Sequence, residues 1–296
     1  MRLVASLFIS FFLLAGCTDK KRGIDQFTPK EVDEISYKIG IALTQGKPEL
    51  LSSLIGMSQV MDSSISLAIS NGLSEYQINR LGLDNPRNYN DGLKETLKWI
   101  CYYSSMDGNV VLSSKKLTKE KISLTYTYSN PANFFEILDF ELITNGYQLF
   151  VGDIKIVHRD TRLSEWIMTN ILSPGYAENI SEMVKALEKA YNEATKENWD
   201  RAEYFFKSVP YEYLIDPMIL EHSIPVTYMF DTLLNKQVFH DAILGIEDDR
   251  AKVYWKVRRE LFFKRTDSIE FYIKGIESLI GQNKITQVLI SNEPNY

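Results

Sequence analysis

After residue 27, apolar side chains recur at helical spacing. Thr28 and Pro29, followed by Glu31, match the N-cap, first-turn proline and capping box of a helix start. Further helices are predicted at 49–57, 65–69, 75–81 and 91–103, with breaks at 46–48, 71–72 and 84–86. The buried face of the first helix is predicted to consist of apolar residues three or four positions apart, namely Val32, Ile35, Ile39 and Leu43.

After residues 107–109 the period changes from helix to strand. Apolar and polar side chains alternate along 122–128, and further strands are predicted at 110–117, 134–142 and 147–158. A turn is expected at 130–133, and Asn145-Gly146 is a strong hairpin signal. The pattern therefore predicts an antiparallel meander of about four strands with helices packed on one face.

Beyond Arg159-Asp160 the strand pattern ends, apart from a weak run at 287–290. A linking helix is predicted at 163–172, a break at 173–175, and paired helices over the remainder. The predicted fold class is α+β followed by an all-α helical-hairpin region. We place the α+β domain at 28–160 and the helical-hairpin domain at 161–296.

The composition indicates a folded protein. The chain has 296 residues, of which 45% are hydrophobic and 24% charged, so it can bury a sizeable core. Nucleic-acid binders neutralise phosphates with clustered Lys and Arg, but the net charge of this chain is -6. A nucleic-acid partner is therefore not expected.

The first sixteen residues match an export signal. Arg2 precedes an apolar run at 3–14, which is too short to span a bilayer. The run ends in Leu14-Ala15-Gly16-Cys17, which resembles the lipobox of bacterial lipoproteins. The resemblance implies removal of residues 1–16 and acylation of Cys17, with palmitate among the chains. The alternative is a chance cysteine behind an ordinary signal peptide.

Acylation of Cys17 would hold the protein to a membrane. Residues 17–27 are polar and are expected to form a tether of up to about 30 Å. Thr18 stands where an aspartate would, by resemblance to enterobacterial sorting rules, indicate inner-membrane retention. An outer-membrane location facing the periplasm is therefore favoured over the inner membrane, although Asp19 weakens the inference.

The two predicted domains resemble known classes. Residues 28–160, ending in the strand 150–157, resemble the cone-shaped nuclear-transport-factor-like and cystatin-like domains, with 58–90 as an insertion. Residues 178–280 resemble tetratricopeptide hairpins, which implies a concave face that binds proteins; the alternative is a plain helical bundle. The three hairpin units rest on Ala190, Ala202 and Phe206; on Val226, Phe239, Ala242 and Ile246; and on Trp255, Phe262 and Phe271.

Several side chains are candidates for chemistry, but a structural interpretation is favoured for each. Asp139, Glu141 and Asp153 alternate with core residues and are expected on an exposed polar sheet face. His158 is expected to be a polar cap at a strand end, and Cys101 a buried structural cysteine. Core packing is favoured for Tyr102, Tyr103, Tyr126 and Tyr128, and a solvated charged face for Glu247, Asp248, Asp249, Arg258, Arg259, Lys264 and Arg265.

No phosphate-binding glycine loop, zinc-ligand spacing or nucleophile elbow is found in the sequence. No catalytic residue, metal site or cofactor is therefore predicted, and we expect a protein that is not an enzyme. The function predicted is a membrane-anchored envelope lipoprotein that serves as a protein-interaction or scaffold module. The alternative is a small-ligand-binding or catalytic α+β domain covered by helices.

Overall fold

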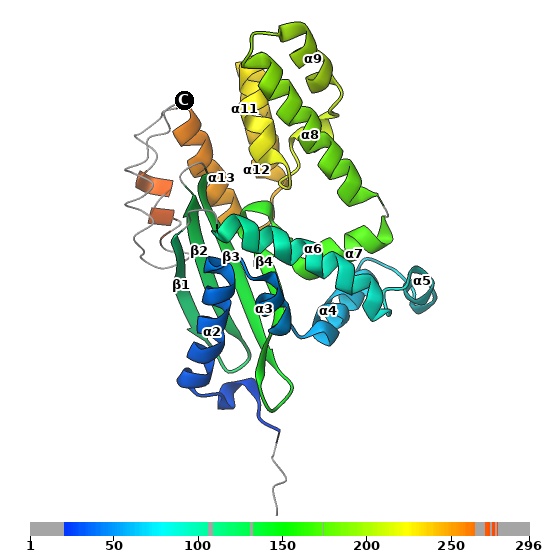
Figure 1. Ribbon diagram of the computed structural model, residues 1–296, viewed down its shortest axis with the longest axis vertical. Coiled ribbons are helices and arrows are strands. Elements are labelled where there is room, and N and C mark those ends of the chain that lie inside the picture. The colour runs from blue at the N-terminus through cyan, green and yellow to red at the C-terminus, as the bar shows by residue number, and fades with distance from the viewer. Residues whose placement is uncertain are drawn as a thin grey trace, which may run out of the picture.

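The computed structural model describes residues 21–105, 109–130, 133–173 and 175–263, with a few further positions among 270–277. Cys17, the turn at 131–132 and the run at 287–290 lie outside these residues. Figure 1 shows helices and sheet in the lower part and helices alone in the upper part. The N-terminal elements are η1 (Ile24–Gln26), α2 (Pro29–Thr44), α3 (Pro48–Ser53), α4 (Met57–Ser70), α5 (Glu75–Leu81) and α6 (Pro86–Ser105).

The predicted start of α2 is confirmed. The Thr28 hydroxyl accepts a hydrogen bond from the Glu31 amide (3.3 Å), and the Glu31 carboxylate accepts one from the Thr28 amide (2.8 Å). These bonds satisfy backbone donors that the first helical turn leaves unpaired. The four apolar positions predicted to form the inner face of this helix are all buried.

A five-stranded antiparallel sheet follows, in the order β1-β2-β3-β4-β5. The fold class predicted from the sequence is thereby confirmed, with one short strand more than expected. Gly146 takes a φ of +93° in the β3–β4 turn, a conformation that favours glycine. The strands are β1 (Asn109–Leu117), β2 (Ile122–Asn130), β3 (Asn133–Thr144), β4 (Leu149–Ile156) and β5 (Thr161–Arg162).

A β-bulge changes the predicted alternation in β4. Glu141 pairs with Asp153, but the next residue, Leu142, pairs with Val151, so Gly152 is the extra residue. Val151 is therefore buried on the same face as Leu142. Simple alternation would put Phe150 on the same face as Ile154, but the bulge shifts the alternation by one position between them, and Phe150 lies on the other face.

The C-terminal region is helical, with α7 on the predicted span. Helices α8 and α9 form one antiparallel hairpin and α11 and α12 a second, and α8 packs against α11. Ala190, Ala202, Phe239 and Ala242 of the first two expected hairpin units are buried, whereas Phe271 of the expected third unit is 76% exposed. The elements are η2 (Val157–Arg159), α7 (Leu163–Leu172), α8 (Tyr176–Ala194), α9 (Trp199–Lys207), α10 (Tyr211–Leu214), α11 (Leu220–Phe230), α12 (Thr232–Gly245) and α13 (Asp249–Phe262).

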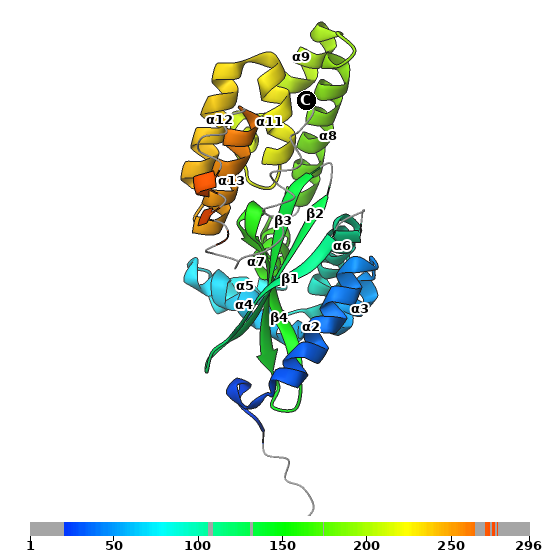
Figure 2. The ribbon, with the colours of Figure 1, turned by 90° about the vertical axis from the view of Figure 1, so that its left-hand side faces the viewer.

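Two apolar cores meet at the upper end of the sheet. The first fills the space between the N-terminal helices and the inner face of the sheet. The second lies among the C-terminal helices and includes Ile137 and Val157 from the sheet segment. The C-terminal helices lie above the sheet, while η1 lies at the opposite end (Figures 1 and 2).

The segment before α2 packs against the domain. The Arg22 amide donates to the Gly146 carbonyl (2.9 Å), its guanidinium pairs with Glu31 (2.8 Å), and Phe27 is buried. The expected tether is thus shorter than predicted, because residues 22–27 are held by the β3–β4 turn and α2. Among the residues described, none of the helices is both long and apolar enough to cross a bilayer.

Candidate functional site

A group of ionisable side chains lies where the upper end of the sheet meets the C-terminal helices. Glu136 comes from β3, His158 from η2 and Glu221 from the first turn of α11. Glu136 and His158 are buried, and Glu221 is half-buried. We call these three residues the Glu-His-Glu cluster.

Strand alternation places Glu136 on the inner, apolar face of the sheet. It pairs with Tyr128 across β2 and β3 and shares the parity of Leu138, which is buried. Beyond β4, the chain forms the short helix η2. This helix ends at Asp160, whose φ is +46°. The Trp255 indole donates a hydrogen bond to the His158 carbonyl (2.7 Å), which holds η2 against α13.

The cluster is compact. The His158 Nε2 lies 3.7 Å from a Glu136 carboxylate oxygen. One candidate ligand atom from each of the three residues lies within 4.8 Å of the other two. Tyr128 donates a hydrogen bond to Glu136, and Tyr254 donates one to Glu221 (3.3 Å). The two tyrosines therefore orient the two carboxylates.

Burial sets the ionisation of the cluster. Removal from water raises the pKa of Glu136 to about 7, and the nearby Glu221 adds to this shift. Removal from water also lowers the pKa of His158 to about 3, so its imidazole is neutral at pH 7. Burial opposes ionisation of Glu221 too, yet its neighbours His158, Arg258 and Arg159 together lower its pKa.

Two arginines surround the cluster. Arg159 donates to the His158 Nε2 (3.3 Å) and to the Met218 carbonyl (3.0 Å), and its guanidinium lies 4.0 Å from the centre of the Trp99 ring. Arg258 acts on both carboxylates through its charge. The two guanidinium groups thus oppose the effect of burial on the pKa of both carboxylates. By contrast, the His158 Nδ1 is buried without a hydrogen-bond partner among the residues that the structure describes.

Two carboxylates and one imidazole are ligand types that divalent transition metals accept. The same groups can also hold a proton between the sheet and α11. Because Glu136 and His158 are buried, a substrate larger than a water molecule or an ion reaches neither unless α11 or α13 moves.

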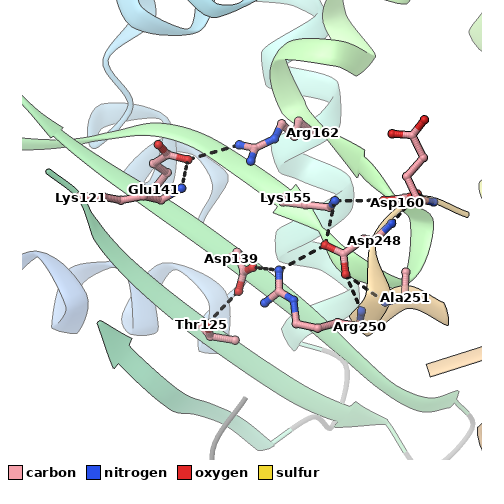
Figure 3. Close-up of polar contacts among 11 residues, drawn as sticks. Lys121, Thr125, Asp139, Glu141, Lys155, Asp160, Arg162, Asp248, Arg250 and Ala251 are labelled. Carbon is pink, nitrogen blue, oxygen red and sulfur yellow. Dashed lines mark hydrogen bonds and ion pairs between the residues drawn. The ribbon is translucent and has the colours of Figure 1, made fainter. Parts of the chain in front are cut away.

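The polar residues predicted on the outer sheet face lie there, but that face is not exposed. Asp153 is buried and accepts hydrogen bonds from the Ser164 hydroxyl (2.6 Å) and amide (3.2 Å) at the start of α7. Asp139 pairs with Arg250 of α13, and Glu141 pairs with Arg162 (3.3 Å; Figure 3). The expectation of a solvated face is therefore wrong for Asp153 and Asp139, which α7 and α13 cover, whereas a third of the Glu141 side chain stays exposed.

The same network includes a residue of the predicted solvated charge run. Asp248 caps α13 and pairs with Lys155 (3.0 Å), which also pairs with Asp160 (3.0 Å; Figure 3). Asp160 in turn accepts a hydrogen bond from the Glu247 amide (2.6 Å). This outer network, made of Asp139, Lys155, Asp160, Asp248 and Arg250, joins the sheet to α13.

Two other predicted interpretations are settled by burial. Cys101 is fully buried, and removal from water raises the pKa of its thiol to about 12, in keeping with a structural cysteine. Tyr126 is buried against Phe140, whereas Tyr102 is exposed on α6.

His158 sits at the strand end as predicted, but it faces other ionisable groups. The sequence analysis missed Glu136 and Glu221. Glu136 could have been noticed in the sequence, since it alternates in step with the apolar positions of β3, where a carboxylate is unexpected. Glu221 could not have been, because the packing of α11 against the sheet brings it there.

The layer between α2, α6 and the sheet is filled by buried side chains, including Ile39, Leu43, Tyr126 and Phe140. A groove of about 430 Å³ lies instead at the lower end, between α2, α3 and the β3–β4 turn, and Lys38 and Tyr147 are among its lining residues. Comparison of the chain with protein-family models, curated proteins and solved structures gave no match.

Proposed function

We propose that this protein is a lipid-anchored envelope protein that presents its C-terminal helices to a protein partner. The observation that carries the proposal is a set of exposed aromatic side chains on those helices. The helices lie at the opposite end of the molecule from η1 (Figure 1). An anchor at one end and a recognition surface at the other suit a protein that reaches from a membrane toward its partner.

The anchored end follows from the lipobox-like residues and from the packing of the N-terminal segment. Cys17 is four residues before Lys21, where the described chain begins, so at most about 14 Å of extended chain separates them. Acylation of Cys17 would therefore keep the β3–β4 turn close to the bilayer. We place the anchor in the outer membrane, with the helices in the periplasm.

The recognition surface is formed by Trp199, Phe206, Tyr228, Phe230 and Leu233, which we call the apical surface. Trp199 and Phe206 both contact the Phe230 ring, with ring centroids 6.1 and 4.7 Å apart. Trp199 is 47% exposed, Tyr228 46% and Leu233 71%. Aromatic side chains are enriched in protein interfaces, and large apolar side chains exposed on α9, α11 and α12 favour a binding role.

The apical surface can be tested by affinity purification of the full-length lipidated protein from host membranes. Trp199→Ala and Leu233→Asp should each lower recovery of the partner by about fivefold or more, the effect of losing about 1 kcal/mol. Tyr37→Ala is the matched control, because Tyr37 is also a large exposed side chain (71%) but lies on α2. Equal recovery with all three variants would contradict the proposed surface.

The anchor is tested separately by membrane fractionation. A Cys17→Ser form that keeps its signal should move from the membrane to the soluble fraction, because it lacks the acylated residue. If this variant stays in the membrane fraction to the same extent as the wild type, the lipoprotein proposal is wrong.

A further inference from the structure

We propose that Glu136, His158 and Glu221 form a reversible binding site for a divalent transition metal, which links the sheet to α11. This inference goes beyond the proposed interaction role and departs from the prediction, made from sequence, of no metal site. It rests on the position of the three side chains, on their hydrogen-bond partners and on the charges beside them.

The spacing of the three ligand groups fits an ion between them. Bonds of about 2.0–2.2 Å from Zn²⁺ to nitrogen or oxygen place neighbouring ligand atoms about 3–3.5 Å apart. The Glu136 and His158 atoms are already 3.7 Å apart, and all three candidate atoms lie within 4.8 Å of one another. A contraction of about 1 Å at Glu221, through its side-chain torsions, completes the site.

The residues around the cluster resemble an outer ligand shell. Tyr128 and Tyr254 each donate a hydrogen bond to one of the carboxylates, and such donors orient the carboxylate ligands of a metal. The Trp255 indole fixes the backbone at His158 through its bond to the carbonyl (2.7 Å). All three donors are aromatic side chains from β2 and α13, so the cluster is enclosed by large, well-packed groups.

His158 supplies the second observation that points to a ligand. Its side chain is fully buried, and its Nε2, the nitrogen that lies 3.7 Å from the Glu136 carboxylate, accepts only one long hydrogen bond, from Arg159 (3.3 Å). A buried nitrogen with only one long hydrogen bond is poorly satisfied, and a neutral imidazole is a preferred ligand of zinc and related ions. An imidazole beside two carboxylates favours transition metals over Ca²⁺ or Mg²⁺, which prefer oxygen ligands.

Arg159 and Arg258 decide how tightly the metal is held. Their charges favour the ionised form of both carboxylates in the metal-free protein. Arg159 also has other partners, the Met218 carbonyl and the Trp99 ring, and it can release His158 while keeping them. Competition between the arginines and the ion therefore makes the site reversible rather than a permanent structural centre.

Zn²⁺ is the probe for the test. Full-length protein, stripped with a chelator and titrated with Zn²⁺ against a chromophoric competitor, should bind one ion. Both Glu221→Gln and His158→Asn should weaken this binding by about tenfold or more. Glu260→Gln is the matched control, since Glu260 is a buried carboxylate that pairs with Arg259 on α13. Zn²⁺ should raise the thermal midpoint of the wild type and of this control only.

Zinc binding of equal strength in the wild type and Glu221→Gln would overturn the proposal, as would the absence of binding by folded wild-type protein. If the variants fail to fold, wild-type crystals soaked in Zn²⁺ decide the question. An anomalous-scattering peak between Glu136, His158 and Glu221 supports the site. Zinc peaks elsewhere with none at these three residues would overturn it.

Discussion

Glu31 accepts hydrogen bonds from the Thr28 amide and hydroxyl and pairs with Arg22. The backbone bond from Thr28 and then the Arg22 guanidinium lower the pKa of this carboxyl to about 2. All of these partners are donors, which favour the ionised form of the carboxyl. One side chain therefore joins the cap of α2 to the segment that leads to the chain start.

Glu31 should make the stability of the folded protein depend on pH, and the direction of this dependence follows from its pKa. Its pKa is about 2 in the folded protein and about 4.5 without these partners, so the stability it adds is fully present above pH 4.5 and is lost as the pH falls toward 2. The difference in unfolding midpoint between wild type and Glu31→Gln should therefore shrink steadily from pH 5.5 to pH 2.5. Urea titrations at several pH values measure it, and a difference that stays constant over this range would refute the assignment.

At the scale of the element, the bulge at Gly152 determines which side of β4 faces the core. A Cβ at this position would stand 2.7 Å from Cγ2 of Ile143. Ile143 is β-branched and has little freedom at χ1, so it cannot easily move aside. The bulge thus depends on a residue without a side chain, while Val151 enters the core and Phe150 turns away.

Gly152→Ala should destabilise the protein by about 1–2 kcal/mol, because the added methyl group overpacks the contact with Ile143. Chemical denaturation gives the change in the free energy of unfolding. Adding Ile143→Ala should recover part of the loss, as expected for two residues in direct contact.

Gly245→Ala is the matched control for Gly152→Ala. A Cβ there meets nothing within 4 Å, and the residue lies at the end of α12, where alanine is a better helix former than glycine. Its free energy of unfolding should be unchanged or slightly higher. Equal destabilisation by both alanine substitutions would mean that the contact with Ile143 does not explain the need for glycine.

At the scale of the molecule, the C-terminal helices are joined to the sheet from two sides. The Glu-His-Glu cluster lies at the inner side, and the outer network lies at the other, where Arg250 pairs with Asp139 and Asp248 (Figure 3). Between them, Ile137 and Val157 of the sheet segment enter the core of the helical region. The position of the apical surface relative to the anchored end depends on these contacts.

Arg250→Ala should loosen α13 from the sheet. The Arg250 and Asp139 side chains are about four-fifths buried, so the loss leaves a largely buried carboxylate unpaired and should cost about 1–3 kcal/mol. Hydrogen exchange should become faster in α13, while exchange in α2 stays as in the wild type. Lys98→Ala removes an exposed ion pair on α6 and should change neither the free energy of unfolding nor the hydrogen exchange of α13. Unchanged exchange in α13 would show that the outer network does not hold this helix.

Local patterns were sufficient for much of the fold. The capping box at Thr28, the span 163–172 of α7, the alternation in β2 and the Asn145-Gly146 turn are confirmed because helix caps, periodicity and hairpin turns depend on residues close in sequence. Cys101 was also placed correctly in the core, since its neighbours follow one helical face. The lipobox at Cys17 stays a prediction.

Only the tertiary structure decided how the two regions meet. Strand alternation put Asp139 and Asp153 on the correct face, but α13 and α7 covered that face, because packing depends on surfaces far apart in sequence. The bulge at Gly152 arose from the register with β3, and Glu221 reached His158 only when α11 packed against the sheet. Residues that interact within one element can be predicted from local sequence, whereas a cluster built from three elements requires the packing of the whole chain.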